Sequence, residues 1–334
     1  MVTDGDGSRM CSYMKRMRTR KSLLLRVCGL LTLLCVCVSL TAWSSTHTLH
    51  QHTAERRNQE ESDLKSTSTC CSPHKQHRPV LRWRIDLEPW ANGTPALQEE
   101  AQRFLSYIST PQVSCDAHRE GYGPWTLCLD QRFSLAQRIR SKHCRVYSLR
   151  LGSSSADVVE RALASSGCDV HCFDPSISSA HLQQQQHLWL HRLSVDWRDP
   201  NPAVPPHRAH SNSRKLKNIL NHFGHRQVDV LKVDVAGAEW ALLENLILDQ
   251  VLEVVGVLLL ELHLHWPGFE VGGDEPAVLR YWFSLMRELE RAHFRLYHSF
   301  SDPSKPHIIL HRNLQNASGS FSLGWVNTRF QPQE

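Results

Sequence analysis

Several familiar motifs are missing from this 334-residue sequence, and each absence narrows the set of functions. No CxxC pair occurs, so a structural zinc site is not expected. Outside the N-terminus the basic residues are scattered without a one-sided basic helix, so no nucleic-acid partner is predicted. The dinucleotide fingerprint GxGxxG is absent, which removes the main support for NAD binding. A clear DxD metal motif is also missing, so a nucleotide-sugar enzyme ranks last among the functions considered.

A basic tail and an apolar run occupy the N-terminus. Lys and Arg cluster in residues 1–22, the apolar segment covers residues 23–43, and no further Lys or Arg follows until Arg56. This asymmetry places the tail in the cytosol and the rest of the chain across a membrane. The segment is predicted to be a signal anchor, giving a single-pass type II membrane protein facing the Golgi or ER lumen, or a cleaved signal peptide of a secreted protein.

Composition divides the remaining chain into three parts. Residues 44–80 are rich in Ser, Thr, His and Gln, which predicts a disordered stem. Residues 81–140 are expected to form an extension of helices and loops, and residues 141–330 to form the main domain. Sequons at Asn92 and Asn316 are consistent with a lumenal glycoprotein.

Seven cysteines follow the apolar segment, and an oxidising lumen would pair some of them. Cys115 and Cys128 bracket a loop containing Gly and Pro, which a disulfide could close. Cys144 and Cys168 each precede a predicted strand by one residue. If those strands are parallel neighbours, the two Cα atoms lie about 5 Å apart, which is within bridging distance.

Strands and helices alternate in the main domain, which predicts an α/β fold with a doubly wound, mostly parallel sheet. The expected strands cover residues 145–149, 169–173, 188–195, 228–233, 254–262, 294–300 and 307–311. The expected helices cover residues 97–107, 134–140, 156–165, 176–186, 213–223, 238–248 and 275–292. A short link separates the last two strands, so this seven-stranded sheet is predicted to end in an antiparallel hairpin.

The ends of the first three strands carry residues suited to an adenosine-containing ligand. Gly152 lets the backbone approach a ligand closely, and Ser153 can donate hydrogen bonds where the next helix begins. Asp174 follows at the spacing where an acid accepts ribose hydroxyls, although it could instead serve a turn before Pro175. Asp196 could meet an adenine amino group or lie in a surface loop.

Residues 228–240, VDVLKVDVAGAEW, predict a buried strand that ends at Asp234, a turn at Gly237 and then a helix. Ligands of open α/β sheets bind beyond the carboxyl ends of strands, which favours a functional role for Asp234. The alternative is that Asp234 caps the helix. Glu239 is a further acidic residue in this otherwise apolar unit.

A second polar pattern occurs in the segment LLLELHLHW. Glu261, His263 and His265 alternate with leucines, so they are expected to share one face of a strand. Beside Asp234 they could form an acid/base group or bind a cation, but no metal is predicted because the spacing matches no metal motif. Asp234, Glu239 and His263 are therefore the predicted catalytic residues.

Four segments in order, YSLRLG, FDPS, LKVDVAGAEW and ELHLHWPG, resemble the lumenal methyltransferase-like proteins and, more distantly, FkbM-type methyltransferases with their KxDxEGxE segment. The resemblance covers roughly residues 80–330. It implies a class I methyltransferase-like Rossmann fold that binds S-adenosylmethionine, with Gly152 and Ser153 at the methionine side, Asp174 at the ribose and Asp234 at the end of the fourth strand. The implied function is a secretory-pathway methyltransferase.

The acceptor is an unknown small molecule, glycan or protein, and the FkbM-type relatives suggest an O-methyl acceptor. Two segments depart from the family patterns. The GxGxG frame holds Arg150, Gly152 and Ser154, and Ala236 stands where the FkbM-type segment has Glu. These departures motivate the alternative of a catalytically inactive lumenal binding module.

Overall fold

The computed structural model describes residues 85–152, 157–199, 213–265, 274–301, 308–310, 312–313 and 318–332. All of them belong to one compact unit, Pro79–Glu334. The predicted tail, apolar segment and stem lie outside the described residues, as do Ser153 and Asn316. Within the described part, no helix has the length and apolar character of a membrane span. The division into an extension over residues 81–140 and a domain over residues 141–330 stays a prediction.

One large sheet organises the described chain, with the strand order β11-β14-β10-β9-β3-β4-β6-β5. Neighbours from β10 to β6 are parallel, whereas β14 is antiparallel to both its neighbours and β5 is antiparallel to β6. The strands are β3 Arg145–Arg150, β4 Asp169–Phe173, β5 His181–Gln185, β6 Leu188–His191, β9 Val228–Asp234, β10 Val255–His263, β11 Phe294–Ser301 and β14 Ser320–Asn327. The α/β class with a mostly parallel sheet is confirmed, but the predicted seven strands are wrong because the sheet has eight.

Two of the expected elements are wrong. The helix expected over residues 176–186 is replaced by β5, because the edge of β6 offers backbone partners that outweigh the helix propensity of a glutamine run. The hairpin expected between residues 294–300 and 307–311 does not form. Instead β11 pairs with β14, and β12 Ile308–Ile309 pairs with β13 Arg312–Asn313 in a separate small sheet.

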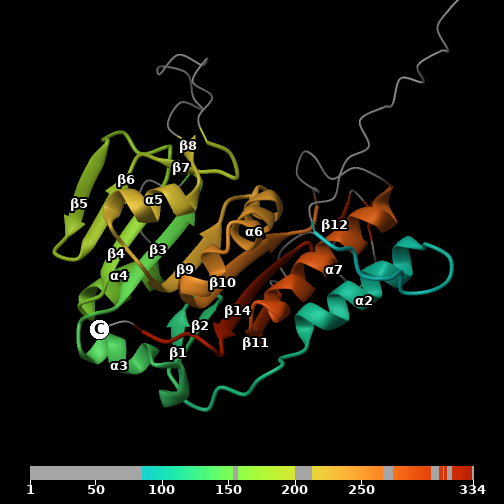
Figure 1. Cartoon of the computed structure of the whole chain (residues 1–334), viewed down its shortest axis with the longest axis horizontal. Coiled ribbons are helices and arrows are strands. Elements are labelled where there is room, and N and C mark those ends of the chain that lie inside the picture. The colour runs from blue at the N-terminus through green and yellow to red at the C-terminus, as the bar shows by residue number, and fades with distance from the viewer. Residues whose placement is uncertain are drawn as a thin grey trace, which may run out of the picture. The chain divides into compact units, whose positions relative to one another are not determined.

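Helices and a hairpin cover the two faces of the sheet and create two apolar cores, because successive strand residues point to opposite faces (Figure 1). On one face lie α2 Leu97–Ser109, α5 Leu216–Phe223, α6 Glu239–Leu248 and α7 Glu275–Arg291, next to the short η2 helix Val251–Val254. On the other lie α3 Leu135–Arg140, α4 Val158–Ser165, the short η1 helix Gln131–Phe133 and the hairpin of β1 His118–Tyr122 and β2 Trp125–Cys128. A small parallel pair, β7 Ser194–Val195 and β8 Ser213–Arg214, follows β6.

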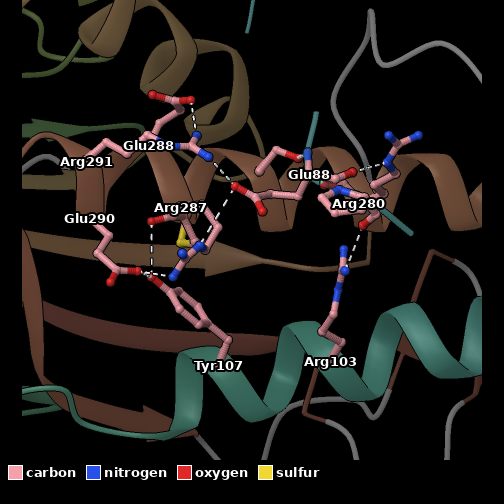
Figure 2. A network of polar contacts seen from close by, with 11 residues as sticks. Glu88, Arg103, Tyr107, Arg280, Arg287, Glu288, Glu290 and Arg291 are labelled. Carbon is pink, nitrogen blue, oxygen red and sulfur yellow. Dashed lines mark hydrogen bonds and ion pairs between the residues drawn. The ribbon is translucent and has the colours of Figure 1, made fainter. Parts of the chain in front are cut away.

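Hydrogen bonds and ion pairs join Glu88, in the segment before α2, to residues of α7 (Figure 2). The backbone N–H of Glu88 donates to Oγ of Ser284 at 2.9 Å, and Nε of Arg280 donates to the Glu88 carbonyl at 2.5 Å. From α2, the Tyr107 hydroxyl donates to the Glu290 carboxylate at 2.9 Å. Burial and the neighbouring carboxylate of Glu290 raise the pKa of Tyr107 to about 12. These contacts tie the N-terminal extension to the helix that covers β11.

Both predicted disulfides are present. Cys115 and Cys128 join the ends of the β1–β2 region with their Cα atoms 5.7 Å apart. Cys144 and Cys168 stand one residue before the parallel neighbours β3 and β4, and their Cα atoms are 4.8 Å apart. This second pair follows from the strand register, as the sequence indicated. Among the described cysteines, Cys172 is the free thiol, and it is buried.

Four histidines form a cluster with aromatic rings around β4, β5, β6 and α5, which we call the histidine cluster: His171, His181, His191 and His225. Nδ1 of His171 lies 3.0 Å from Nε2 of His191, whose Nδ1 lies 2.9 Å from Nδ1 of His181. Burial, together with the neighbouring imidazoles, lowers the pKa of His171 to about 3 and that of His191 to about 4. Neutral imidazoles can form this chain because each ring nitrogen can act as donor or acceptor.

Candidate functional site

The strand order reverses between β3 and β9, since β4 and β6 lie on one side of that pair and β10 on the other. Such a switch point is where open α/β sheets bind ligands, just beyond the carboxyl ends of the strands. Arg150 at the end of β3 is in register with Asp234 at the end of β9, and Gly152 follows directly. The glycine turn and Asp234 therefore meet at the switch point.

The turn after β3 requires glycine. Gly152 has φ +83°, and a Cβ added there would meet no atom within 4 Å. Its N–H donates to Oδ1 of Asp174 at 3.3 Å, which links the turn to the end of β4. Gly152 is thus open on the side where a side chain would project, and its N–H is held by the side chain of Asp174.

Asp174 lies directly after β4 and is fully buried. Its Oδ1 accepts hydrogen bonds from the N–H of Ser176 at 2.8 Å and from its hydroxyl at 2.6 Å. Nε of Arg150, which is only 5% exposed, lies 3.7 Å from Oδ2. Arg150, which stands where the family pattern has glycine, therefore places its positive charge beside Asp174, the residue predicted to bind the ribose.

Asp196 follows β7, away from the main sheet. Its Oδ1 accepts from the N–H of Arg198 at 3.0 Å, and Nε of the same arginine lies 3.5 Å away. The structure therefore places Asp196 in the connection beyond β6, and its predicted contact with an adenine amino group stays a prediction.

Asp234 ends β9 and is partly buried. Burial, only partly offset by the charges of Lys232 and His263, raises the pKa of its carboxyl above the ordinary value. Helix α6 begins after the N-cap residue Ala238 without a side-chain capping bond, so Asp234 does not cap that helix. The turn between them contains Ala236 at φ +50°, a left-handed conformation that is unusual for alanine. Within the described residues, no hydrogen bond or ion pair engages the Asp234 carboxylate.

Glu239, at the start of α6, is fully buried, and its carboxylate bonds to one residue after β9 and to the last residue of β10. Its Oε2 accepts from the N–H of Gly237 at 2.6 Å. Its Oε1 accepts from the N–H of His263 at 2.7 Å and lies 3.1 Å from Nδ1 of the same histidine. The carboxylate that the sequence placed among the catalytic residues is thus enclosed, and it holds the β9–α6 turn and His263 in place.

His263 lies at the end of β10, with 21% of its side chain exposed. Burial alone would lower the pKa of this imidazole. The hydrogen bond and charge of Glu239, with the charges of Glu261 and Asp234, outweigh that effect and raise the pKa above its ordinary value. His263 is therefore a partly exposed imidazole in an acidic environment.

Glu261 shares the face of β10 with His263 and is bound by β14. Ser320 donates to one carboxylate oxygen at 2.5 Å, and Ser322 donates to the other. Burial raises the pKa of Glu261 despite these two hydrogen bonds. Both serines escaped the sequence reasoning because β14 was not expected, although the alternation in SFSLGWV is typical of a strand.

An ion-pair group surrounds the buried Lys232 of β9. Nζ of Lys232, in β9 and only 1% exposed, lies 2.5 Å from the carboxylate of Asp157 and 3.0 Å from that of Glu160. The hydroxyl of Ser148 donates to Glu160 at 2.6 Å. Burial would lower the pKa of Lys232, but the two carboxylates raise it. The group joins β3, β9 and the start of α4, and its only sign in the sequence is Lys232 in an otherwise apolar strand.

Two hollows of about 500 and 580 Å³ lie at the opposite edge of the sheet. Their walls share Gln250 and Glu253, close to the amino ends of β9 and β10. None of the predicted site residues lines either hollow. The site residues that the structure brings together are instead at the carboxyl edge: Gly152, Asp174, Asp234, Glu239 and His263.

Comparison with known proteins adds independent findings. A family model described as a methyltransferase domain matches residues 70–295. The human protein named "Probable methyltransferase-like protein 24" is 53% identical over 272 residues, covering 78% of this chain and 74% of its own. The rat protein of that name is 52% identical over 273 residues, covering 79% and 75%. The resemblance predicted from the four sequence segments is confirmed.

Among solved structures, a crystal structure of WbdD aligns with 68% of this chain and 47% of its own at 15% identity, with a TM-score of 0.27. A superposition of that quality carries no structural argument.

Proposed function

The chain belongs to the methyltransferase domain family, and we propose that it transfers a methyl group from S-adenosylmethionine to an acceptor in the secretory pathway. The observation that carries the proposal is the switch point between β3 and β9. There the open glycine turn at Gly152, the carboxylate of Asp234 and the turn of Asp174 lie along one edge of the sheet.

The residues at this edge match the parts of the proposed cofactor. Ribose hydroxyls need an acceptor, and Asp174 already accepts a hydroxyl hydrogen from Ser176 at 2.6 Å. Rotation of that serine side chain would let a ribose hydroxyl take its place. Gly152 and Ser153 would lie at the methionine side, and Asp196 at the adenine. When bound, the cofactor supplies a methyl group on a positively charged sulfur.

Positioning accounts for much of the catalysis in this proposal, because methyl transfer is a displacement between two bound reactants. Asp234 lies at the switch point, and no described residue bonds to its carboxylate, so its negative charge would favour a cationic sulfur nearby. His263 lies close enough to Asp234 for each charge to shift the pKa of the other. These two side chains face the place where the reacting groups would meet.

A lumenal location is part of the proposal. The disulfides Cys115–Cys128 and Cys144–Cys168 suit an oxidising compartment. The apolar segment over residues 23–43 would anchor the chain in the membrane or direct its secretion after cleavage. The acceptor would then be a small molecule, glycan or protein of the secretory pathway.

The test is a calorimetric titration of the full-length chain with S-adenosylmethionine, using two matched glycine variants. Gly152 and Gly224 both have a positive φ, +83° and +69°, and open space for a Cβ, so alanine strains the backbone similarly at each. Only Gly152 lies at the switch point, whereas Gly224 ends α5 at the opposite edge. We expect Gly152→Ala to weaken binding at least about tenfold, or 1.4 kcal/mol, and Gly224→Ala to leave it unchanged.

Absence of binding by the unmodified chain, or equal loss in both variants, would contradict the proposal. A second candidate is a lumenal module that binds the cofactor without transferring the methyl group. The observation that favours it is Ala236, which leaves the β9–α6 turn without the glutamate of the FkbM-type segment. Cofactor binding with no methyl transfer to any acceptor would support this candidate.

A further inference from the structure

His263 and Glu239 form a carboxylate–imidazole pair at the carboxyl edge, next to Asp234. Oε1 of the fully buried Glu239 lies 3.1 Å from Nδ1 of His263 and also accepts the backbone N–H of that histidine at 2.7 Å. Two bonds from one oxygen to one residue fix both the backbone and the ring. The ring therefore has a defined orientation before any ligand binds.

The pair also fixes which ring nitrogen carries the proton. An ionised carboxylate only accepts hydrogen bonds, so Nδ1 of His263 must be the donor toward Glu239. In the neutral ring the lone pair then resides on Nε2. No described residue forms a hydrogen bond with that nitrogen, and 21% of the side chain is exposed. Nε2 is thus available to accept a proton from a bound molecule.

We propose that His263 is the general base of the transfer, that Glu239 positions it, and that the acceptor is a hydroxyl group; this rests on the methyltransferase function proposed above. The charges around the ring select the acceptor. Asp234 faces it from β9, Glu239 from α6 and Glu261 from its own strand, while the neutral Ser320 lies opposite it on β14.

Three neighbouring carboxylates act differently on each acceptor class. They repel a carboxylate or phosphate acceptor, which needs no base in any case. They hold an amine as its ammonium ion, which has no lone pair for attack. A hydroxyl is neutral and must lose its proton as the new bond forms, so it benefits from a base.

The proposed step balances as follows. An oxygen lone pair of the acceptor forms the bond to the methyl carbon, and the carbon–sulfur bond breaks with its electron pair left on sulfur. The hydroxyl proton goes to Nε2 of His263, and the resulting imidazolium later releases it to water. Glu239 stays ionised and stabilises the imidazolium through Nδ1.

The first test measures the protonation of His263 without any methyl-transfer reaction. Diethyl pyrocarbonate acylates neutral imidazoles, so its reaction at His263 in the full-length chain, followed by mass spectrometry across pH, reports deprotonation of that ring. We expect the midpoint above 6.5 in the unmodified chain and lower by about one pH unit or more in Glu239→Gln. Asp234→Asn should also lower it, which keeps the test valid if Glu239→Gln does not fold.

Glu253→Gln is the control, because Glu253 is exposed at the opposite edge and should leave the midpoint unchanged. A midpoint below 6.5 in the unmodified chain, or one that neither Glu239→Gln nor Asp234→Asn lowers, would overturn the pairing.

The second test identifies the acceptor class. The full-length chain is incubated with methyl-labelled S-adenosylmethionine and the lumenal contents of microsomes, and the labelled linkage is characterised. The proposal is supported if the label is found in base-stable methyl ethers and their rate of formation rises with pH. The midpoint of that pH dependence should fall in Glu239→Gln. Label released as methanol by mild base, or found in methylated amines or thioethers, overturns it. Loss of cofactor binding in the calorimetric titration would instead count against the proposed function.

Discussion

Histidines occupy two contrasting regions of the same sheet. In the histidine cluster, burial among aromatic rings and other imidazoles lowers the pKa values of His171 and His191 to about 3 and about 4. At the carboxyl edge, Glu239 and two further carboxylates raise the pKa of His263 despite its burial. The side chain is the same, so the neighbours alone decide whether its pKa is lowered or raised.

The two regions also differ in the hydrogen bonds of their ring nitrogens. In the histidine cluster, ring nitrogens of His171 and His181 lie within 3.0 Å of His191, and His225 bonds to the Tyr147 hydroxyl. His263 has one nitrogen engaged by Glu239 and the other directed to no described residue. Histidines with shifted pKa values occur in both regions. Among the described residues, only His263 combines a shifted pKa with a ring nitrogen that no described residue bonds to, at a switch point.

The largest expected effect concerns the carboxylate that sustains the charged region. Glu239→Ala removes the acceptor for the N–H of Gly237 and for both donors of His263. Leaving these buried donors unpaired should lower the free energy of unfolding by about 3–5 kcal/mol, measured by urea denaturation at pH 7. Glu253→Ala, at an exposed position, should change it by less than about 0.5 kcal/mol. A loss of under about 1 kcal/mol in Glu239→Ala would show that the hydrogen bonds of Glu239 do not hold the turn.

The next effect tests the neutral region. The folded pKa of His171 lies below its unfolded value, so between pH 6.5 and 4 the unfolded chain binds more protons and stability falls as the pH falls. At pH 5 this group alone should cost on the order of 2 kcal/mol relative to pH 7. His171→Phe keeps an aromatic ring and should flatten the urea-derived stability profile in that window. An unchanged slope would mean that His171 is charged in the folded protein.

A smaller effect is expected at the rim of the histidine cluster. The Tyr147 hydroxyl lies 2.6 Å from Nδ1 of His225. Tyr147→Phe removes that hydrogen bond from a fully buried ring and should lower the free energy of unfolding by about 1 kcal/mol. Thermal unfolding at neutral pH measures it, and no shift would indicate that water replaces the bond.

The smallest effect belongs to a histidine outside both regions. Nδ1 of His187 lies 3.2 Å from the carboxylate of Asp169, and both side chains are about a third or more exposed, at 34% and 44%. Asp169→Asn should therefore change the free energy of unfolding by less than about 0.5 kcal/mol in urea denaturation. A larger change would mean that a carboxylate beside a histidine stabilises the fold even without burial, which would weaken the contrast between the regions.

Sequence patterns predicted the parts of the site that depend on local order. The strand end at Asp234, the turn at Gly152 and the shared face of Glu261 and His263 follow from strand periodicity and glycine placement. The Cys144–Cys168 bridge follows from strand register once two strands are taken as parallel neighbours.

Parts that depend on long-range pairing were not predictable in the same way. β5 and β14 obtain their partners from β6, β10 and β11, so their own residues carried only a weak signal. The enclosure of Glu239, on which its proposed positioning role rests, depends on β10 lying against the β9–α6 turn. The pairing of Arg150 with Asp174 likewise requires β3 and β4 to be adjacent.

One measurement tests this account of the site most directly: a ¹³C NMR titration of the histidine rings in the full-length chain, assigned by single substitutions. The account predicts that His263 titrates above pH 6.5, while His171 and His191 stay neutral at pH 5. A His263 ring that titrates below 6.5, together with cluster rings that charge before pH 5, would contradict it.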